Sequence, residues 1–207
     1  MTDSYAFLRL RGPGRDTTAL RSVLQDQLFG AWRQDGVAVW GVWAGLFGIA
    51  SNELIVVVAA AGARDLEAFT APLASSAVDV EVIDSLLLAP TVRPERPTPC
   101  DRPGLYVFRF FEVLGRDVEE IAALSKEAWE TFENTDAYAA EPQGLFRQAG
   151  QGAEESGRML LVTWYDGLES WQTSRQPNPA ATENFLRRRE LTAGTVALAT
   201  RLLEPFA

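Results

Sequence analysis

Six residues in the second half of the chain could together bind a small molecule. They are Arg109, Phe111, Trp164, Tyr165, Trp171 and Arg175. A guanidinium can hold an anion or a carbonyl oxygen, while aromatic rings offer flat faces for stacking. Trp171 and Arg175 are four positions apart, so on a helix they would share one face and permit a cation–π contact. The set predicts a ligand site without assigning a catalytic residue.

Arg109 lies in an apolar stretch that should form a central strand, where a charge is costly unless it is paired. It could contact an anion or a carbonyl group inside a cavity, or form a structural ion pair with Glu112 or a helix carboxylate. Alternate residues of a strand face opposite sides, which separates Arg109 from Tyr106, Phe108 and Phe110. We expect this aromatic triplet to pack against helices and Arg109 to face the cavity.

Packing in the hydrophobic core is the alternative role for the tryptophans of this chain. Trp129 fits a core position on a helix. Trp40 and Trp43 are three positions apart on a strand and therefore lie on opposite faces, so only one of them can line a cavity. The basic run Arg187 to Arg189 is expected on a solvated helix face.

The chain contains no histidine and a single cysteine, Cys100. Without histidine, Ser-His-Asp and Cys-His catalysis, proximal-histidine haem ligation and the usual zinc and iron sites are excluded. No spacing typical of a calcium loop or of a phosphate-binding glycine loop occurs, so we expect no metal and no cofactor. Cys100 lies in a proline-rich segment and is expected to be a linker residue rather than a nucleophile.

The composition favours an acidic globular protein. Of its 207 residues 47% are hydrophobic, and the formal net charge is -9 with an isoelectric point near 4.6. This charge would repel phosphate groups, so nucleic acid and anionic membranes are not expected as partners. The first residues do not resemble a signal peptide, and no apolar run is long enough to span a membrane, which favours a cytoplasmic location. The remaining partners are a small-molecule ligand and further copies of the chain in a homo-oligomer.

The chain shows signs of an internal repeat. Tyr5–Asp16 aligns without a gap on Tyr106–Asp117, with Tyr, Phe, Gly, Arg and Asp at the same spacing. The Leu-Leu-x-Pro sequence that ends at Pro90 recurs with its end at Pro205. A proline-rich stretch separates the halves and is typical of a boundary, because proline removes a backbone donor and favours extended structure. We predict a first repeat over 1–92, a linker over 93–103 and a second repeat over 104–207.

Each half is expected to place its elements in the ferredoxin-like order β-α-β-β-α-β. Apolar patterns predict strands at 5–11, 37–47, 54–60, 78–88, 105–114, 145–148, 158–165 and 195–203. Helical spacing predicts helices at 16–35, 65–71, 117–138, 168–173 and from Asn178 to 191. A sheet with helices on one face needs a cover for the other. The predicted fold class is α+β: two tandem ferredoxin-like repeats packed sheet to sheet as an intramolecular dimeric α/β barrel.

Several stretches resemble the NIPSNAP family, which is part of the dimeric α/β-barrel group. They are Tyr106–Val113 with Gly115, Gly41–Gly48 with Asn52–Val57, and Leu161–Arg175. These are similar to the family's opening strand with its arginine, its central hairpin, and a strand-to-helix passage rich in aromatic residues. Related barrel families include haem enzymes, cofactor-free monooxygenases and small-ring isomerases. The first half has Leu8 where the second has Arg109, so we expect the first repeat to be mainly a structural partner.

Three functions are compatible with these features. The first is a NIPSNAP-like cytoplasmic protein that binds a small, partly aromatic or anionic molecule in the barrel cavity. The second is a cofactor-free monooxygenase or isomerase acting on an aromatic or polyketide-like substrate, with Arg109 and Tyr165 stabilising an oxyanion and a carboxylate as base. The third is a structural assembly protein whose barrel is filled by side chains. The sequence leaves open whether the chain is an enzyme.

Overall fold

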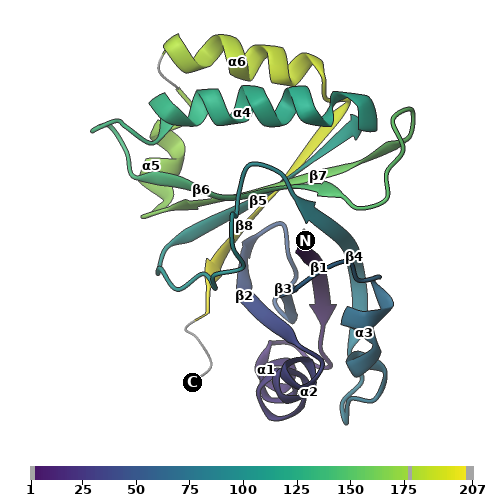
Figure 1. Cartoon of the computed structure of the whole chain (residues 1–207). Coiled ribbons are helices and arrows are strands. Elements are labelled where there is room, and N and C mark those ends of the chain that lie inside the picture. Colours follow the sequence, from purple (N-terminus) through teal and green to yellow (C-terminus); the bar gives the residue numbers. More distant parts are fainter. Residues whose placement is uncertain (1–2, 177–178, 204–207) are drawn as a thin grey trace. The chain divides into compact units, whose positions relative to one another are not determined.

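The computed structural model describes residues 3–176 and 179–203 (Figure 1). The chain forms two compact units. Unit 1 holds the described residues of Met1–Ala89, Arg96–Pro103 and Thr200–Ala207, and unit 2 holds those of Pro90–Glu95 and Gly104–Ala199. The predicted linker, 93–103, is thus divided between the units: the carbonyl of Arg93 pairs with β6 of unit 2, and the amide of Cys100 with β2 of unit 1. A tandem origin of the halves remains a prediction.

Unit 1 contains a four-stranded antiparallel sheet in the order β4-β1-β3-β2. Its strands are β1 Ser4–Arg11, β2 Val37–Phe47, β3 Glu53–Ala60 and β4 Glu81–Pro90. Its helical segments are α1 Thr18–Val23, the π-helical turn η1 Leu24–Leu28, α2 Phe29–Gln34 and α3 Glu67–Ala74. This order of elements and strands is the ferredoxin-like arrangement.

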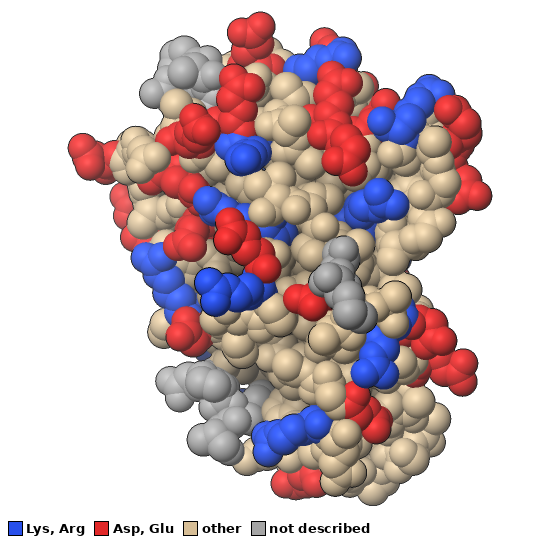
Figure 2. Space-filling model, in the orientation of Figure 1, with Lys and Arg blue, Asp and Glu red and all other residues tan. Residues whose placement is uncertain are grey.

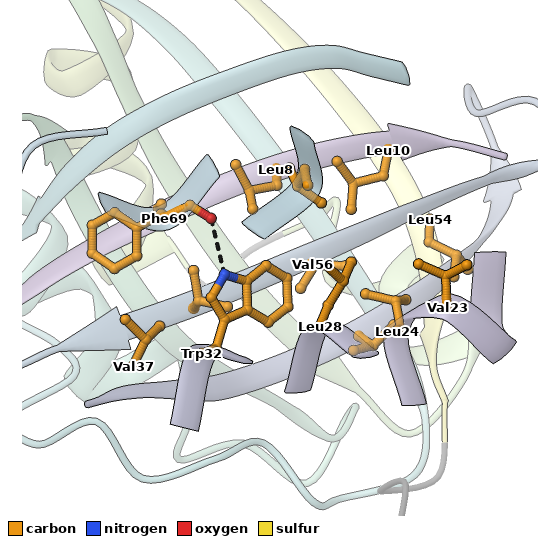
Figure 3. Packing of buried hydrophobic residues seen from close by; sticks show 14 of the residues in the cluster. Leu8, Leu10, Val23, Leu24, Leu28, Trp32, Val37, Leu54, Val56 and Phe69 are labelled. Carbon is orange, nitrogen blue, oxygen red and sulfur yellow. Dashed lines mark hydrogen bonds between the residues drawn. The ribbon is translucent and has the colours of Figure 1, made fainter. Parts of the chain in front are cut away.

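The core of unit 1 lies between this sheet and its helices (Figure 3). Leu8 of β1 and Val56 of β3 are fully buried, as is Trp32 of α2. The Trp32 indole nitrogen donates a hydrogen bond to the Phe69 carbonyl oxygen at 2.9 Å, drawn as the dashed line in Figure 3. This bond joins α2 to α3 and leaves the indole without an unpaired polar atom in the core.

Glu53, the first residue of β3, is a buried carboxylate between two arginines. It accepts hydrogen bonds from Arg9 Nε at 2.6 Å and from Arg11 Nη2 at 2.7 Å, and Arg11 also pairs with Glu81 at 2.9 Å. Burial alone would raise the pKa of Glu53, but the hydrogen bonds from Arg11 and Arg9 bring it below its ordinary value. The network fastens β1, β3 and β4 together at one end of the sheet.

Unit 2 shows the same order of elements. Its strands are β5 Leu105–Leu114, β6 Ala140–Gln148, β7 Ser156–Tyr165 and β8 Gly194–Leu202, arranged as β8-β5-β7-β6. Its helical segments are the 3-10 turn η2 Gly115–Asp117, α4 Val118–Phe132, α5 Leu168–Thr173 and α6 Pro179–Glu190. Helices α4 and α6 run side by side over one face of the sheet (Figure 1).

The two faces of β5 are the reverse of the prediction. Phe111 packs against α4, so the face that carries Arg109 points towards the helices. Tyr106, Phe108 and Phe110, which we expected against the helices, therefore lie on the opposite face. Alternation establishes which residues share a face but not which face the helices cover, and both faces of this strand carry large apolar side chains. Arg109 fits on the helix side because a pocket opens there.

The largest differences from the predicted boundaries of unit 2 are in β6 and α4. Strand β6 begins at Ala140 rather than at 145, and a register shift beside Pro142 lets the strand accommodate a residue that cannot donate to the ladder. Helix α4 ends at Phe132 rather than at 138. The Asn134 side chain there donates to a carbonyl oxygen of the last helical turn at 2.6 Å, which satisfies one of its terminal acceptors.

Some predictions fall outside the described residues, namely the helix start at Asn178 and the end of the second Leu-Leu-x-Pro sequence at Pro205. Among the residues that are described, no helix is long and apolar enough to cross a membrane. Nor do these residues bring three cysteine or acidic side chains together in a group that could hold a metal ion.

Candidate functional site

A pocket of about 530 Å³ lies in unit 2 between the sheet and the helices α4 and α6. Its floor consists of alternate residues of two neighbouring strands: Val107, Arg109 and Phe111 of β5, and Leu161, Thr163 and Tyr165 of β7. The antiparallel pairing sets Val107 opposite Thr163 and Arg109 opposite Leu161. Because successive side chains of a strand alternate, both sets project to the helix-facing side of the sheet.

The walls of the pocket are largely aromatic. Trp129 and Phe132 of α4 and Phe185 of α6 line it. The Phe132 and Phe185 rings meet edge to face, with 6.1 Å between their centroids. Such rings bury apolar area and present flat surfaces, so they suit a ligand that is itself flat.

The Arg188 guanidinium is held from three elements. Its central carbon lies 5.2 Å from the centroid of the Phe111 ring of β5 and 5.0 Å from that of Phe185 of α6. Its Nη1 donates a hydrogen bond to Ser125 Oγ of α4 at 3.2 Å. Burial, and then the charge of Arg109, lower the pKa of Arg188 to about 10, so the group remains a cation at neutral pH. Its position is fixed although no carboxylate pairs with it among the described residues.

Arg109 and Arg175 bring further positive charge to the same pocket. Burial, and then the charge of Arg175, lower the pKa of Arg109. No carboxylate pairs with Arg109 in the described part of the chain, and Glu112, the partner considered from the sequence, lies on the opposite face of β5. Arg175 is exposed and lines the pocket from the turn that follows α5. The described residues therefore contain no acidic partner for the structural ion pair that the sequence allowed for Arg109.

Tyr165 supplies a hydroxyl group to this cluster of cations. Burial raises the pKa of its phenol, although hydrogen bonding with Ser174 and the charges of Arg109 and Arg175 oppose the rise. The phenol therefore stays protonated at neutral pH and can donate a hydrogen bond to an oxygen in the pocket. Ser174 is held in turn, because its hydroxyl donates to the Trp171 carbonyl oxygen at 2.8 Å.

The charge of the pocket lining is entirely positive. Its arginines are Arg109, Arg175, Arg188 and Arg189, and the described lining contains no lysine, aspartate or glutamate. This contrasts with the net charge of -9 for the chain and with the interspersed acidic and basic side chains on the face shown in Figure 2. Guanidinium groups repel one another, and an anion placed among them would be stabilised by all of them. The arrangement suits a flat ligand with an anionic oxygen.

Four of the six predicted ligand residues line this pocket: Arg109, Phe111, Tyr165 and Arg175. Trp164 does not, because it neighbours Tyr165 on β7 and therefore points to the opposite face of the sheet. Trp171 is also outside the lining and packs against the buried cluster that contains Phe132 and Tyr165.

The predicted contact between Trp171 and Arg175 is not formed within the described structure. Helix α5 ends at Thr173, two residues before Arg175, so the two side chains do not share a helix face. The Ser174 hydroxyl closes the last turn by bonding back to Trp171, and the chain then leaves the helix. The four-residue spacing would place the pair together only on a longer helix.

Trp129, Phe185 and Arg188 are among the lining residues that were not predicted as ligand contacts. Trp129 was expected in the core, and it is buried there while also lining the pocket. The basic run was expected to be solvated, and Arg187 does pair with exposed Glu120 at 2.9 Å, but Arg188 turns inward. The spacing of Phe185 and Arg188 on one face of the helix was the available signal.

A haem group, which some families related to NIPSNAP contain, does not fit the residues of this pocket. The chain has no histidine, and the described lining contains no cysteine or methionine. Tyr165 is its one phenol, and burial keeps that group protonated, whereas an axial tyrosine binds iron as the phenolate. The described lining of this pocket is therefore not suited to hold haem.

A second pocket, of about 500 Å³, lies in unit 1 beside α2 and β2. Phe29, Arg33 and Trp40 are among its lining residues, together with Cys100. The Cys100 amide donates to the Trp40 carbonyl oxygen at 2.7 Å, so Cys100 lies beside β2. Arg33 is the one charged side chain in the described lining of this pocket. The pocket therefore offers fewer groups for recognising a charged ligand than the pocket in unit 2 does.

Solved structures with the same fold cover nearly the whole chain. An anthrone oxidase-like protein matches with a TM-score of 0.61 and 13% identity, over 97% of this chain and 92% of that chain. A variant of the chlorite dismutase from Candidatus Nitrospira defluvii matches with a TM-score of 0.64 and 13% identity, over 99% and 92% of the two chains. A protein provisionally named a monooxygenase, from Fusobacterium nucleatum subsp. nucleatum, has a TM-score of 0.59 and 12% identity over 98% and 93%.

These likenesses show the fold, which is that of the dimeric α/β-barrel group with its ferredoxin-like sheets. At such low identity they do not show an activity for this chain. No protein-family model and no curated protein matches the sequence. Membership of the NIPSNAP family therefore remains a prediction from the sequence.

Proposed function

We propose that the chain binds a flat, acidic aromatic molecule in the pocket of unit 2 and oxygenates it without a cofactor. The observation that carries the proposal is a pocket with four arginines, aromatic walls and no carboxylate in its described lining. The names of two structural neighbours, an oxidase-like protein and a monooxygenase, favour this reaction over binding alone. An aromatic or polyketide-like substrate, as considered from the sequence, has the required shape and acidity.

The chemistry asks the protein to stabilise an electron-rich anion of the substrate. A methylene group between two aromatic rings that are also joined by a carbonyl group loses a proton to give an enolate, which can react directly with dioxygen. The balanced reaction converts the methylene group and one dioxygen into a carbonyl group and one water, so no external reductant is needed. Arg109 and Arg188 would stabilise the oxyanion, Tyr165 would donate a hydrogen bond to it, and the aromatic walls would limit the access of water.

The base in the monooxygenase hypothesis differs from the one expected from the sequence. A carboxylate was expected as the base, but the described lining of the pocket offers none. This observation also favours the second candidate function, a NIPSNAP-like protein that binds the molecule without turning it over. Substrate turnover separates the two candidates.

The test is aerobic incubation of the purified protein with 1,8-dihydroxyanthrone, measuring oxygen uptake and formation of the anthraquinone. We expect catalysis above the buffer rate, and a loss of about 100-fold or more in kcat for Arg109→Met, as for other oxyanion-stabilising groups. Arg187→Met is the matched control, since Arg187 lies beside Arg188 on α6 but outside the pocket lining. If the rates equalled the rate in buffer while ligand binding stayed intact, the oxygenase function would be rejected and ligand binding would remain as the function.

A further inference from the structure

Several strands and helices of unit 2 contribute side chains to the pocket. Arg109 comes from β5, Tyr165 from β7, Arg175 from the turn after α5, and Arg188 and Arg189 from α6. Helix α4 contributes Trp129 and Phe132, β6 contributes Pro142, and β8 contributes Thr195, none of which titrates near neutral pH. Every titratable group in the described lining is therefore a guanidinium or a phenol.

None of these groups can take a proton from a ligand at neutral pH. The guanidiniums are already protonated, and burial keeps the Tyr165 phenol protonated as well. The carboxylates of α6 nearest in sequence, Glu183 and Glu190, are not among the lining residues; they lie in an adjoining exposed depression that shares Thr182 and Leu186 with the pocket. A proton lost by a bound ligand must therefore leave to solvent.

The same groups stabilise the charge that such a loss would create. Arg188 is fixed by the Phe111 ring, the Phe185 ring and the Ser125 hydroxyl, so it does not need to reorganise when an anion arrives. Arg109 would not have to break an ion pair in order to bind an anion, because no carboxylate pairs with it in the described structure. Preorganised cations of this kind stabilise the charged form of a neighbouring acid.

We infer that the pocket binds a phenol or enol as its conjugate base, and that the proton is released to solvent instead of being accepted by a protein base. The inference concerns the same pocket as the proposed function and rests on it for the class of ligand. An opposite charge within about 4–6 Å typically favours the charged form of an acid by roughly ten- to a thousandfold. The bound ligand should show a preference of that size for its ionised state.

Three anthraquinones test this without any turnover: 2-hydroxyanthraquinone, whose absorption moves to longer wavelength on ionisation, anthraquinone-2-carboxylate, which stays ionised, and unsubstituted anthraquinone. Each is titrated into the full-length protein between pH 5 and 9, and dissociation constants and spectra are recorded. We expect bound 2-hydroxyanthraquinone to show the phenolate spectrum at least one pH unit below the point where the free compound ionises. Calorimetry in buffers of different ionisation enthalpy should then show about one proton released for each molecule bound.

The variants assign the effect to the guanidiniums. Arg109→Met and Arg188→Met should each move the ionisation of the bound phenol back towards that of the free compound. Arg187→Met should leave it unchanged, and the melting temperature of each variant identifies loss of folding. Affinity of the unsubstituted ring should change least, because it carries no charge.

Several results would overturn the inference. A bound 2-hydroxyanthraquinone with the spectrum of the neutral phenol would do so, as would binding of all three compounds with equal affinity at every pH, or no saturable binding of any of them. The proposed function fails independently: a phenolate spectrum without anthrone oxidation would leave a binding site for aromatic anions. Oxidation without the spectral shift would retain the enzyme and reject the ionising site.

Discussion

At the scale of single residues, the chain places charge inside the protein in two different ways. In unit 1 the buried Glu53 carboxylate is neutralised by Arg9 and Arg11. In unit 2 the guanidiniums of Arg109 and Arg188 have no carboxylate among the described residues. A buried charge that is paired within the chain is already satisfied, whereas one without a partner is available to a ligand. The contrast separates a structural cluster from a candidate binding site.

Replacing Glu53 by glutamine should destabilise the chain by roughly 1–3 kcal/mol at pH 7, because two arginines lose a charged acceptor. The pKa of Glu53 is lowered in the folded state, so its contribution is present above its ordinary value of 4.5 and is lost as the pH falls through the folded value. Urea unfolding of both proteins at pH 7 and near pH 3 measures this. The difference between them should shrink in acid, and an equal difference at both pH values would contradict the role of the carboxylate charge.

At the scale of elements, the short segment before the second half of the chain braces the pocket from outside. The Arg93 carbonyl oxygen accepts from the Leu145 amide of β6 at 2.9 Å. Its guanidinium lies 5.2 Å from the Trp129 ring of α4, donates to Glu133 at 3.0 Å, and donates to the Pro142 carbonyl oxygen at 3.0 Å. Both Trp129 and Pro142 line the pocket, so Arg93 connects two of its walls without entering it.

Replacing Arg93 by methionine should therefore weaken ligand binding several-fold and lower stability by about 1–2 kcal/mol, since it removes a bidentate pair and a cation–π contact. Affinity for anthraquinone-2-carboxylate and urea unfolding give the two quantities. Arg116→Met is the control, because its partner Glu154 is exposed and such pairs contribute about 0–1 kcal/mol. Unchanged affinity in the Arg93 variant would show that it stabilises the fold without positioning the pocket walls.

At the scale of the whole molecule, the sheet of unit 2 has large apolar side chains on both faces. Its helices lie over the face that carries Phe111. Tyr106, Phe108 and Phe146 project from the other face and are fully buried in the chain. Within unit 2 taken alone, α4 and α6 cannot cover this second face, because they lie on the first.

We expect the fragment 104–207 to self-associate when expressed without the first half. Several large apolar side chains left in water cost roughly 1.5–3 kcal/mol each, which is comparable with the whole stability of a small domain. Light scattering after size-exclusion chromatography measures the mass, and circular dichroism measures folding. A monomeric fragment with a cooperative thermal transition would show that the second face needs no cover.

Most of the helices and strands, and their order along the chain, could be predicted from local patterns in the sequence. Continuous apolar runs predicted buried strands such as β3, and helical spacing predicted the apolar stripe of α4 that contains Ile121 and Trp129. The sequence also brought forward four residues that line the pocket, among them Arg109, which stood out because a charge in an apolar strand is costly unless it is paired. These properties are local, since they depend on alternation and spacing within a single element.

The direction in which those residues face, and the contacts between them, depend on how the elements pack and could not be predicted. Alternation could not say which side of β5 the helices cover, and they lie over the side of Arg109 instead of the predicted side of the aromatic triplet. The predicted helix over 168–173 ended before Arg175, as α5 does, so the four-residue spacing alone did not establish a shared helix face for Trp171 and Arg175. Nor could helical spacing show that Arg188 turns inward between rings from β5 and α6. A pocket arises from packing between elements distant in sequence, and that information is absent from the pattern of any one of them.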